Sequence, residues 1–284
     1  MTAPVRIAHR GASGQGLAPE NTLAAFALAL QIGVDALEID VHATRDGQIV
    51  VLHDADLQRT TDRRGLVHEL TLDQVRQADA GGWFGAQFRG ERVPTLREVL
   101  DLARNRALVL IEVKADFIAE RTLQIIADAK AGEQVVLQSF NPETVRRIHS
   151  LEPGFPVAQL IGKLAGTSAR RQARKLAQTL LQDGANALAI WHGALSPAFL
   201  DEMRKRAISV WTWTVDEPAV LRDVIQMGVQ GIISNHPDRL NHVLEELEQE
   251  GAILVPMGRR QRLKPSRWRR RRQIRKVSRS RRGA

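Results

Sequence analysis

The chain has 284 residues, of which 43% are hydrophobic, 26% are charged and none is cysteine. A domain of this size buries roughly 75% of the surface that its unfolded chain exposes, so it needs no disulfide or structural zinc to fold. The formal net charge of +9 comes from one segment, because residues 259–284 contain 14 Lys and Arg and no acidic residue. The rest of the chain has 27 basic and 32 acidic residues. The sequence therefore predicts a mildly acidic globular body with a separate basic tail.

Short runs rich in β-branched residues alternate along the chain with longer segments of helical periodicity. Strands are expected at Val5–His9, Ala36–Val41, Leu108–Lys114, Val135–Phe140, Val157–Ile161, Ala187–Trp191, Ser209–Val215 and Gly231–Ser234. Helices are expected at Asn21–Gln31, Leu96–Arg104, Ala119–Ala131, Pro142–Ser150, Ser168–Gln182, Ser196–Arg206, Glu217–Met227 and His236–Gln249. Eight strands, each paired with a helix, predict an α/β fold, a (β/α)8 TIM barrel. An open doubly wound sheet is the alternative, but no glycine-rich dinucleotide-binding motif follows the first strand.

The segment LEIDVHATRDGQIVVLHD, residues 37–54, departs from this alternation. Too few residues lie between its two apolar halves for a crossover connection, which needs about a dozen. The sequence predicts instead an antiparallel hairpin arm that turns at Asp46-Gly47, a favourable turn pair. Such a hairpin brings His53 roughly opposite Glu38, at the carboxyl end of the second strand.

An insertion of about 40 residues, 55–94, follows the arm and contains one short helical pattern near Leu72–Ala78. On the catalytic face of a barrel, an insertion usually shapes the substrate pocket or a lid. The alternative is a surface excursion that packs over the helices. We therefore expect one TIM-barrel domain over residues 1–250, with this insertion, and a tail over residues 251–284.

Three carboxylates lie at the ends of two predicted strands. Glu38 and Asp40 point to the same face by alternation, while Ile39 points outward to the helices. Glu112 lies near the carboxyl end of the next strand. Acids aimed into a barrel are costly to bury unless a cation compensates them, and hard oxygen ligands suit Ca²⁺ or Mg²⁺. The pattern favours one divalent metal ion, although a salt bridge or helix cap explains each acid taken alone.

Two histidines and two basic residues converge on the same region. His9 and Arg10 end the first strand, His53 ends the hairpin, and Lys114 lies two residues beyond Glu112 on the same face. A phosphodiester cleavage needs a base for the attacking oxygen and an acid for the leaving oxygen, and paired histidines supply both. Arg10 and Lys114 would offset the negative charge of the phosphoryl oxygens. Packed histidines and ion pairs with the acids are the alternative interpretation.

A series of motifs along residues 5–240 resembles the glycerophosphodiester phosphodiesterase family. The motifs are IAHRG, APENT, LEIDVHATRDGQIVVLHD, LQRTTDRRG, GGWFG, FRGERVPTLREVL, LVLIEVK, VVLQSF, VWTWTVD and GIISNHP. A single one of them would be weak evidence, but their order and spacing together are specific.

The resemblance implies a TIM barrel of the phospholipase-C-like type. It implies a divalent metal held by Glu38, Asp40 and Glu112, with His9 and His53 as the acid and base. The substrate would be a glycerophosphodiester, cleaved to sn-glycerol 3-phosphate and an alcohol through a cyclic phosphate formed by the substrate's own hydroxyl. A phosphodiesterase acting on lysophospholipids, or a barrel that only binds anionic surfaces, are the alternatives.

The motifs of the resemblance contain further positions of interest. Glu20 would contact substrate or metal, while Thr22 is interpreted as the cap of the first helix. Trp213, which shares a face with Trp211 and Val215 by alternation, would line the pocket or simply fill the barrel. Where the family often has an acid after the last strand, this chain has Asn235, so a carboxylate is missing there.

The basic tail, residues 259–284, has little apolar content and is predicted to be disordered in isolation. It would bind an anionic membrane surface, with Trp268 at the interface, or a nucleic acid, or have no dedicated partner. The first residues contain no apolar signal segment, and no run of the chain approaches 18 uninterrupted apolar residues. A cytoplasmic protein without a transmembrane segment is expected, either free or held at the inner membrane surface by its tail.

Overall fold

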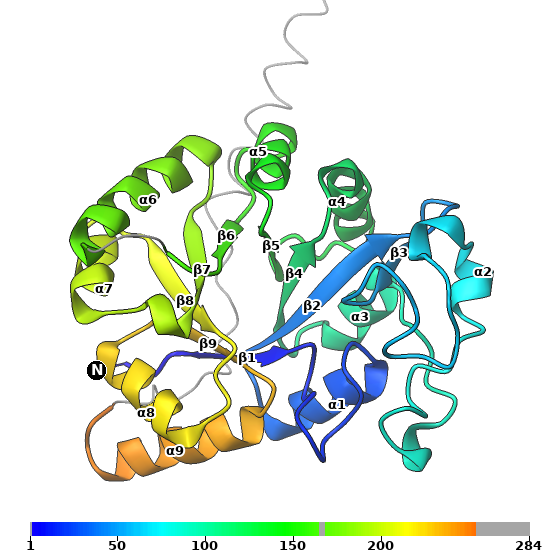
Figure 1. Ribbon diagram of the computed structural model, residues 1–284, viewed down its shortest axis with the longest axis horizontal. Coiled ribbons are helices and arrows are strands. Elements are labelled where there is room, and N and C mark those ends of the chain that lie inside the picture. Colours follow the sequence, from blue (N-terminus) through cyan, green and yellow to red (C-terminus); the bar gives the residue numbers. More distant parts are fainter. Residues whose placement is uncertain (1, 165–167, 254–284) are drawn as a thin grey trace, which may run out of the picture.

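The computed structural model describes residues 2–164 and 168–253. At its centre is a closed parallel barrel surrounded by helices (Figure 1). The barrel strands are β1 (Val5–His9), β2 (Ala36–Ala43), β4 (Leu108–Val113), β5 (Val135–Ser139), β6 (Val157–Ile161), β7 (Ala187–Trp191), β8 (Ser209–Trp213) and β9 (Gly231–Ser234). Each pairs in parallel with its sequence neighbours, and β1 pairs with both β2 and β9, which closes the ring. The predicted TIM barrel is confirmed.

The helices pack around the outside of this barrel, as in Figure 1. They are α1 (Leu23–Ile32), α3 (Leu96–Ala103), α4 (Ala119–Asp128), α5 (Pro142–Leu151), α6 (Ala169–Asp183), α7 (Pro197–Arg204), α8 (Pro218–Met227) and α9 (Pro237–Gln249). Four of them begin with proline, whose missing N–H costs nothing in a first turn. Thr22 caps α1 by accepting a hydrogen bond from the N–H of Ala25, as expected from the sequence.

Apolar side chains form two layers, one on each face of the barrel strands. The larger layer lies between strands and helices and includes Ile39 and Val41, both fully buried. A smaller layer fills the inside of the barrel at its amino-terminal end, with Ile7, Leu110 and Ile233. The inner positions nearer the carboxyl end of β2 are instead acidic, which confirms the outward and inward alternation predicted there.

The predicted hairpin is present, because β3 (Ile49–Val51) pairs antiparallel with the end of β2. The insertion that follows contains 3-10 helices at Val67–Glu69 and Ala86–Phe88 and the short helix α2 (Leu72–Val75). It has its own small apolar cluster around Leu57 and Val75. In Figure 1 it lies beside β2 and β3, on the opposite side of the barrel from α6 and α7.

One predicted alternation is wrong. Strand β8 ends at Trp213, two residues earlier than expected. Trp211 and Trp213 contact the inner apolar layer, whereas Val215 belongs to the outer layer beneath the helices. The N–H of Val215 donates to the carbonyl of Ile233, so the chain turns after Trp213 and the period of two no longer applies.

No helix within residues 2–164 and 168–253 is both long and apolar enough to cross a membrane. The basic tail, with the disorder and the partners predicted for it, lies outside the described residues.

Candidate active site

Three acidic side chains meet at the carboxyl end of the barrel. Glu38 and Asp40 come from β2 and Glu112 from β4, where Asp40 and Glu112 are directly paired in the register. One carboxylate oxygen of each lies within 4.8 Å of the others, and all three residues are buried. The structure thus brings together the three acids that the sequence singled out, in a donor set of hard oxygens that suits a divalent cation.

Arg10 and Lys114 lie against these acids. Lys114 Nζ is 2.7 Å from both Asp40 Oδ1 and Glu112 Oε1, and Arg10 Nε is 3.3 Å from Asp40 Oδ2. The backbone N–H of Arg10 also donates to Glu38 Oε2 at 3.1 Å, with Arg10 in the left-handed region at φ 56°. Buried ionised groups need such compensation, so the two cations allow the acids to remain in the barrel.

Two amide side chains complete the cluster, and the sequence analysis missed both. Asn21 Nδ2 donates to Asp40 Oδ2 at 2.9 Å, and Gln138 Nε2 donates to Glu38 Oε1 at 3.0 Å. Gln138 could have been noticed as a polar residue in the apolar run VVLQS, on the strand next to Glu112. Asn21 carried no such signal, because its position looked like a helix start.

The acids differ in their tendency to ionise. Burial and the repulsion of Asp40 raise the pKa of Glu38 well above its usual value. The same two causes raise the pKa of Glu112 to about 7. For Asp40, burial acts to raise the pKa, but Lys114 and Arg10 outweigh it and hold the pKa of Asp40 well below its usual range. The protein alone therefore does not easily hold three ionised carboxylates here, and a cation would complete the charge balance.

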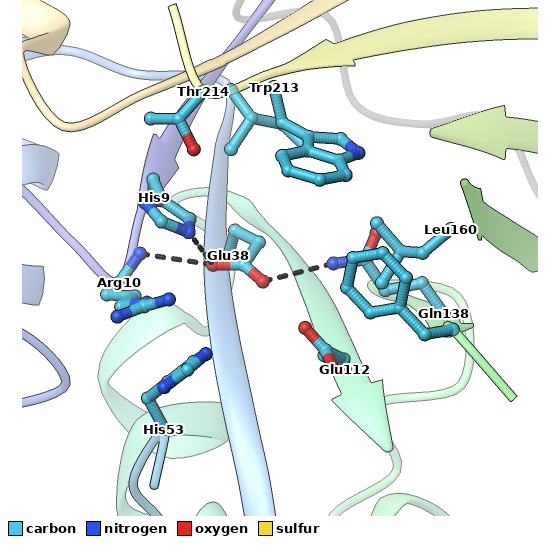
Figure 2. A pocket seen from close by; sticks show the side chains of 11 residues that line it. His9, Arg10, Glu38, His53, Glu112, Gln138, Leu160, Trp213 and Thr214 are labelled. Carbon is cyan, nitrogen blue, oxygen red and sulfur yellow. Dashed lines mark hydrogen bonds and ion pairs between the residues drawn. The ribbon is translucent and has the colours of Figure 1, made fainter. Parts of the chain in front are cut away.

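The two histidines lie on the same side of the cluster, as Figure 2 shows. His9 Nε2 is 4.0 Å from Glu38 Oε2, and His9 Nδ1 is 2.7 Å from Asn235 Oδ1. Burial and the positive charge of Arg10 lower the pKa of His9 to about 4, which keeps its ring neutral. His53 Nδ1 lies 2.6 Å from Asp54 Oδ1. Both rings line the same cavity.

That cavity has a volume of about 170 Å³ at the mouth of the barrel. One side, the charged wall, consists of His9, Arg10, Glu38, His53 and Glu112. The other side, the apolar wall, consists of Phe140, Leu160 and Trp213, and Phe140 packs edge to face on Trp213 with ring centroids 5.5 Å apart. Trp213 therefore belongs to the pocket, whereas Trp211 does not line it.

Glu20 and the insertion lie behind the charged wall. Glu20 does not line the cavity but accepts hydrogen bonds from Arg10 at 2.9 Å and from Arg59 at 2.8 and 2.9 Å. Arg59 also contacts Asp54, the partner of His53. No residue of the insertion, 55–94, is among those that line this cavity, so its role in shaping a pocket or a lid stays a prediction. The hairpin closes this side of the cavity instead, and the insertion reaches the site only through Arg59.

A parallel barrel with buried acids, two histidines and two basic residues at the carboxyl ends of its strands defines a TIM-barrel enzyme, because this face carries the active sites of such barrels. Comparison with known proteins specifies it further. The model of the glycerophosphoryl diester phosphodiesterase family matches residues 9–239. The chain therefore belongs to this family of hydrolases.

Individual relatives agree with this assignment. A glycerophosphodiester phosphodiesterase of Caldanaerobacter subterraneus is 33% identical over 246 residues, which cover 84% of this chain and 97% of the relative. The crystal structure of a glycerophosphodiester phosphodiesterase from Agrobacterium tumefaciens superposes with a TM-score of 0.73 at 30% identity, covering 85% of this chain and all of that one. A phosphodiesterase of Oleispira antarctica in complex with the product sn-glycerol-3-phosphate has a TM-score of 0.75 at 26% identity, covering 86% and 97%.

Proposed function

We propose that this protein hydrolyses glycerophosphodiesters to sn-glycerol 3-phosphate and an alcohol, using one divalent metal ion and the His9 and His53 pair. The observation that carries this proposal is the meeting of Glu38, Asp40 and Glu112 within 4.8 Å, flanked by both histidines in one cavity. The product bound to the Oleispira antarctica relative supports the choice of substrate.

The donor set fits a hard divalent ion. Glu38, Asp40 and Glu112 offer three carboxylate oxygens, while Arg10 and Lys114 supply only two positive charges against them. Ca²⁺ or Mg²⁺ would be held by these three acids, since both prefer oxygen ligands. Bound there, the ion would polarise the phosphoryl oxygens and stabilise the charge that develops on them.

In the first step, the substrate's neighbouring glycerol hydroxyl attacks phosphorus and transfers its proton to His9 Nε2. The bond from phosphorus to the alcohol breaks, and the departing oxygen receives a proton from His53, so a cyclic phosphate and the free alcohol result. The pKa of His9, lowered to about 4, keeps its ring in the neutral form that can accept a proton, while it makes the ring a weaker base than a free imidazole. Arg10 and Lys114, which pair with the acids of the cluster, would offset the phosphate's charge.

In the second step, the two histidines exchange roles. Water attacks the cyclic phosphate and transfers its proton to His53, while the ring oxygen departs and takes the proton that His9 holds. The sum is one water consumed for each diester cleaved, with both histidines returned to their starting state.

Two buried polar atoms of cavity residues have no hydrogen-bond partner among the described residues, namely Gln138 Oε1 and Trp213 Nε1. Buried polar atoms are normally paired, so these two are available to a ligand. Gln138 Oε1 would accept from a substrate hydroxyl, and Trp213 Nε1 would donate to a substrate oxygen. The apolar wall would lie against the carbon skeleton of the glycerol.

The histidine roles are tested with the variants H9A and H53A on a natural diester and on a diester whose leaving group is an activated phenol. Each substitution should lower turnover of the natural diester about 10²- to 10⁴-fold. The activated leaving group needs no acid, so it should restore turnover in H53A but not in H9A. Equal behaviour of the two variants would show that the assignment is wrong.

Metal dependence is tested by removing divalent ions with a chelator and adding back Ca²⁺ or Mg²⁺ separately. Release of glycerol 3-phosphate should stop and then return. A panel of soluble diesters assayed beside lysophospholipids decides whether the alternative lipid substrate applies. Undiminished turnover in the chelated protein would contradict the role given to the three acids.

For the basic segment 259–284, we propose binding to an anionic membrane surface that supplies the substrate's parent lipids. Its 14 basic residues each contribute about 1 kcal/mol near such a surface, and Trp268 suits the interface. Flotation with phosphatidylserine vesicles should recover the full chain but not a chain lacking residues 259–284. Equal recovery of both chains, or recovery with RNA in preference to vesicles, would contradict it.

A further inference from the structure

Asn235 stands where the family often has an acid, yet it contacts the proposed base. His9 Nδ1 is 2.7 Å from Asn235 Oδ1, and Ser13 Oγ lies 2.7 Å from the His9 carbonyl oxygen and 3.0 Å from the same Asn235 oxygen. An amide has an oxygen that accepts and a nitrogen that donates, so it can present either group to an imidazole. Which group faces His9 decides which nitrogen of the neutral ring carries the proton.

Asp216 settles the orientation of that amide. Asn235 Nδ2 donates to Asp216 Oδ2 at 2.7 Å, and the backbone N–H of Asn235 donates to Asp216 Oδ1 at 2.8 Å. Ser234 Oγ donates to Asp216 Oδ1 as well, at 3.0 Å. A carboxylate only accepts hydrogen bonds, so the amide nitrogen must face Asp216 and the amide oxygen must face His9.

The consequence for His9 follows from the same chemistry. Asn235 Oδ1 can only accept, so Nδ1 of a neutral His9 must carry the proton, and Nε2 presents its lone pair. Nε2 is the nitrogen that lies 4.0 Å from Glu38, a residue that lines the cavity. In the opposite tautomer Nε2 would hold a proton and could not serve as a base.

We propose that Asp216 is a positioning residue that orients the Asn235 amide and thereby fixes His9 in the Nδ1–H tautomer. This rests on the proposed function only for the use made of His9, because the tautomer itself is a property of the free protein. Asp216 lies on the segment after β8 and Asn235 follows β9. The two residues that orient His9 therefore come from the ends of two adjacent strands. Neither residue lines the cavity.

The direct test is the protonation pattern of the His9 ring, observed by long-range ¹H–¹⁵N correlation in histidine-labelled, metal-free protein at pH 7.5. The signal is assigned by its loss in H9F. We expect Nδ1 to carry the proton in the unmodified chain. A ring protonated at Nε2 would overturn the proposal, whatever the activity of the protein.

The variant D216N keeps the shape of the side chain but replaces its carboxylate with an amide. An amide at position 216 both donates and accepts, so the Asn235 amide is free to turn over and present its nitrogen to His9. We expect part or all of the His9 signal to change to the Nε2–H form. The value of kcat should fall about 10- to 100-fold, the usual effect of losing a partner that orients a functional histidine, with KM little changed. An unchanged tautomer together with unchanged kcat would overturn the proposal.

The double variant N235D/D216N keeps one carboxylate and one amide in this hydrogen-bond network but exchanges their positions. The carboxylate at position 235 accepts from His9 Nδ1, and the amide at position 216 donates to it while its oxygen accepts from Ser234. We expect the Nδ1–H tautomer and most of kcat to return. The proposal would be overturned if the double variant has the circular dichroism spectrum of the unmodified chain but does not regain the Nδ1–H tautomer.

A matched control is D223N, which makes the same change at an exposed position of α8. It should alter neither the tautomer nor kcat. If D216N alone does not fold, the tautomer of the unmodified chain and the double variant still decide the question. If the unmodified chain shows the expected tautomer but releases no glycerol 3-phosphate, the proposed function fails while this inference stands.

Discussion

The charged wall of the cavity comes from β1, β2 and β4, which are neighbours in the barrel, and from the end of the hairpin after β3, whereas the apolar wall comes from the ends of β5, β6 and β8. The charged wall contains two buried acids, Glu38 and Glu112, whose pKa values are raised by burial and by the neighbouring Asp40. The apolar wall contributes aromatic surface and excludes water on the other side of the same space. Because Coulomb interactions strengthen as the surroundings become less polar, the second wall makes the first more effective. We therefore expect substitutions on the charged side to affect catalysis and substitutions in the apolar wall to affect substrate binding.

The largest effect is expected from D40N, in the acidic cluster directly behind the charged wall. Asp40 contacts Lys114, Arg10 and Asn21 and is one of the three metal-ligand candidates. Its loss should remove several kcal/mol of charge stabilisation, about a 10³-fold loss of kcat/KM or more. Titration of the variant with Ca²⁺ should also show weakened binding.

The control for this change is D35N, because Asp35 precedes the same strand at the opposite end of the barrel and pairs with Arg6. It should lower stability slightly and leave turnover intact. Similar losses of turnover in both variants would mean that D40N acts through the fold and not through the site.

Next comes the pH dependence of the stability of the metal-free protein. The pKa of Glu112 is raised from 4.5 to about 7, so the folded state binds a proton that the unfolded state has released between these values. The stability that this group contributes is thus greatest below about pH 4.5 and is lost as pH rises through 7, by an amount on the order of 3 kcal/mol. The variant E112Q should be stabilised relative to the unmodified chain more at pH 8 than at pH 5.5.

Urea unfolding at the two pH values measures this difference. His9 acts in the opposite sense, because its lowered pKa makes the folded state bind fewer protons between about pH 4 and 6.5. That contribution is present in both proteins and cancels in the comparison. A gap between the two proteins that does not widen from pH 5.5 to pH 8 would contradict the raised pKa of Glu112.

A smaller effect is expected from F140A in the apolar wall. The change removes the edge-to-face contact with Trp213 and part of the surface facing the substrate. Such pairs contribute about 0.5–1.5 kcal/mol, so KM should rise about 3- to 10-fold while kcat changes little. The measurement is steady-state kinetics on a soluble glycerophosphodiester.

The matched control is F117A, since Phe117 is 74% exposed and does not line the cavity. Its KM should stay at the unmodified value. A fall of kcat without a rise of KM in F140A would show that the apolar wall takes part in the chemistry as well as in binding.

The smallest effect is expected from R59A, which disconnects the insertion from the charged wall. Arg59 pairs with Glu20 and Asp54, but it is about half exposed, and exposed ion pairs are worth about 1 kcal/mol or less. Turnover should fall by a few fold and the melting temperature by a few degrees. A loss as large as that of D40N would show that the insertion belongs to the active site after all.

Much of this molecule could be predicted from its sequence because the relevant patterns are local. The period of two along β2 placed Glu38 and Asp40 inside and Ile39 outside, and the structure confirms it. The short connection at Gly47 forced an antiparallel hairpin, which is present. Prolines at helix starts and Thr22 before α1 gave the helix beginnings, since capping depends on neighbours within one turn.

Other features depended on residues distant in the sequence and could not be read from local patterns. The turn after Trp213 sent Val215 to the outer layer, because the Val215 N–H bonds to Ile233 on another strand. The lining of the cavity comes from segments outside the insertion, which reaches the charged wall through Arg59. Gln138 joins Glu38 across 100 positions of sequence, a contact that only the closed barrel creates.

The sequence by itself determined the alternation of strands and helices and the set of ionisable groups that ends the strands, because periodicity and turn chemistry act between near neighbours. Only the tertiary structure decided which of those groups touch, how their pKa values separate, and that an amide and an acid from adjacent strands orient His9. Electrostatic interactions and hydrogen bonds depend on distance in space, and closing the barrel fixes those distances.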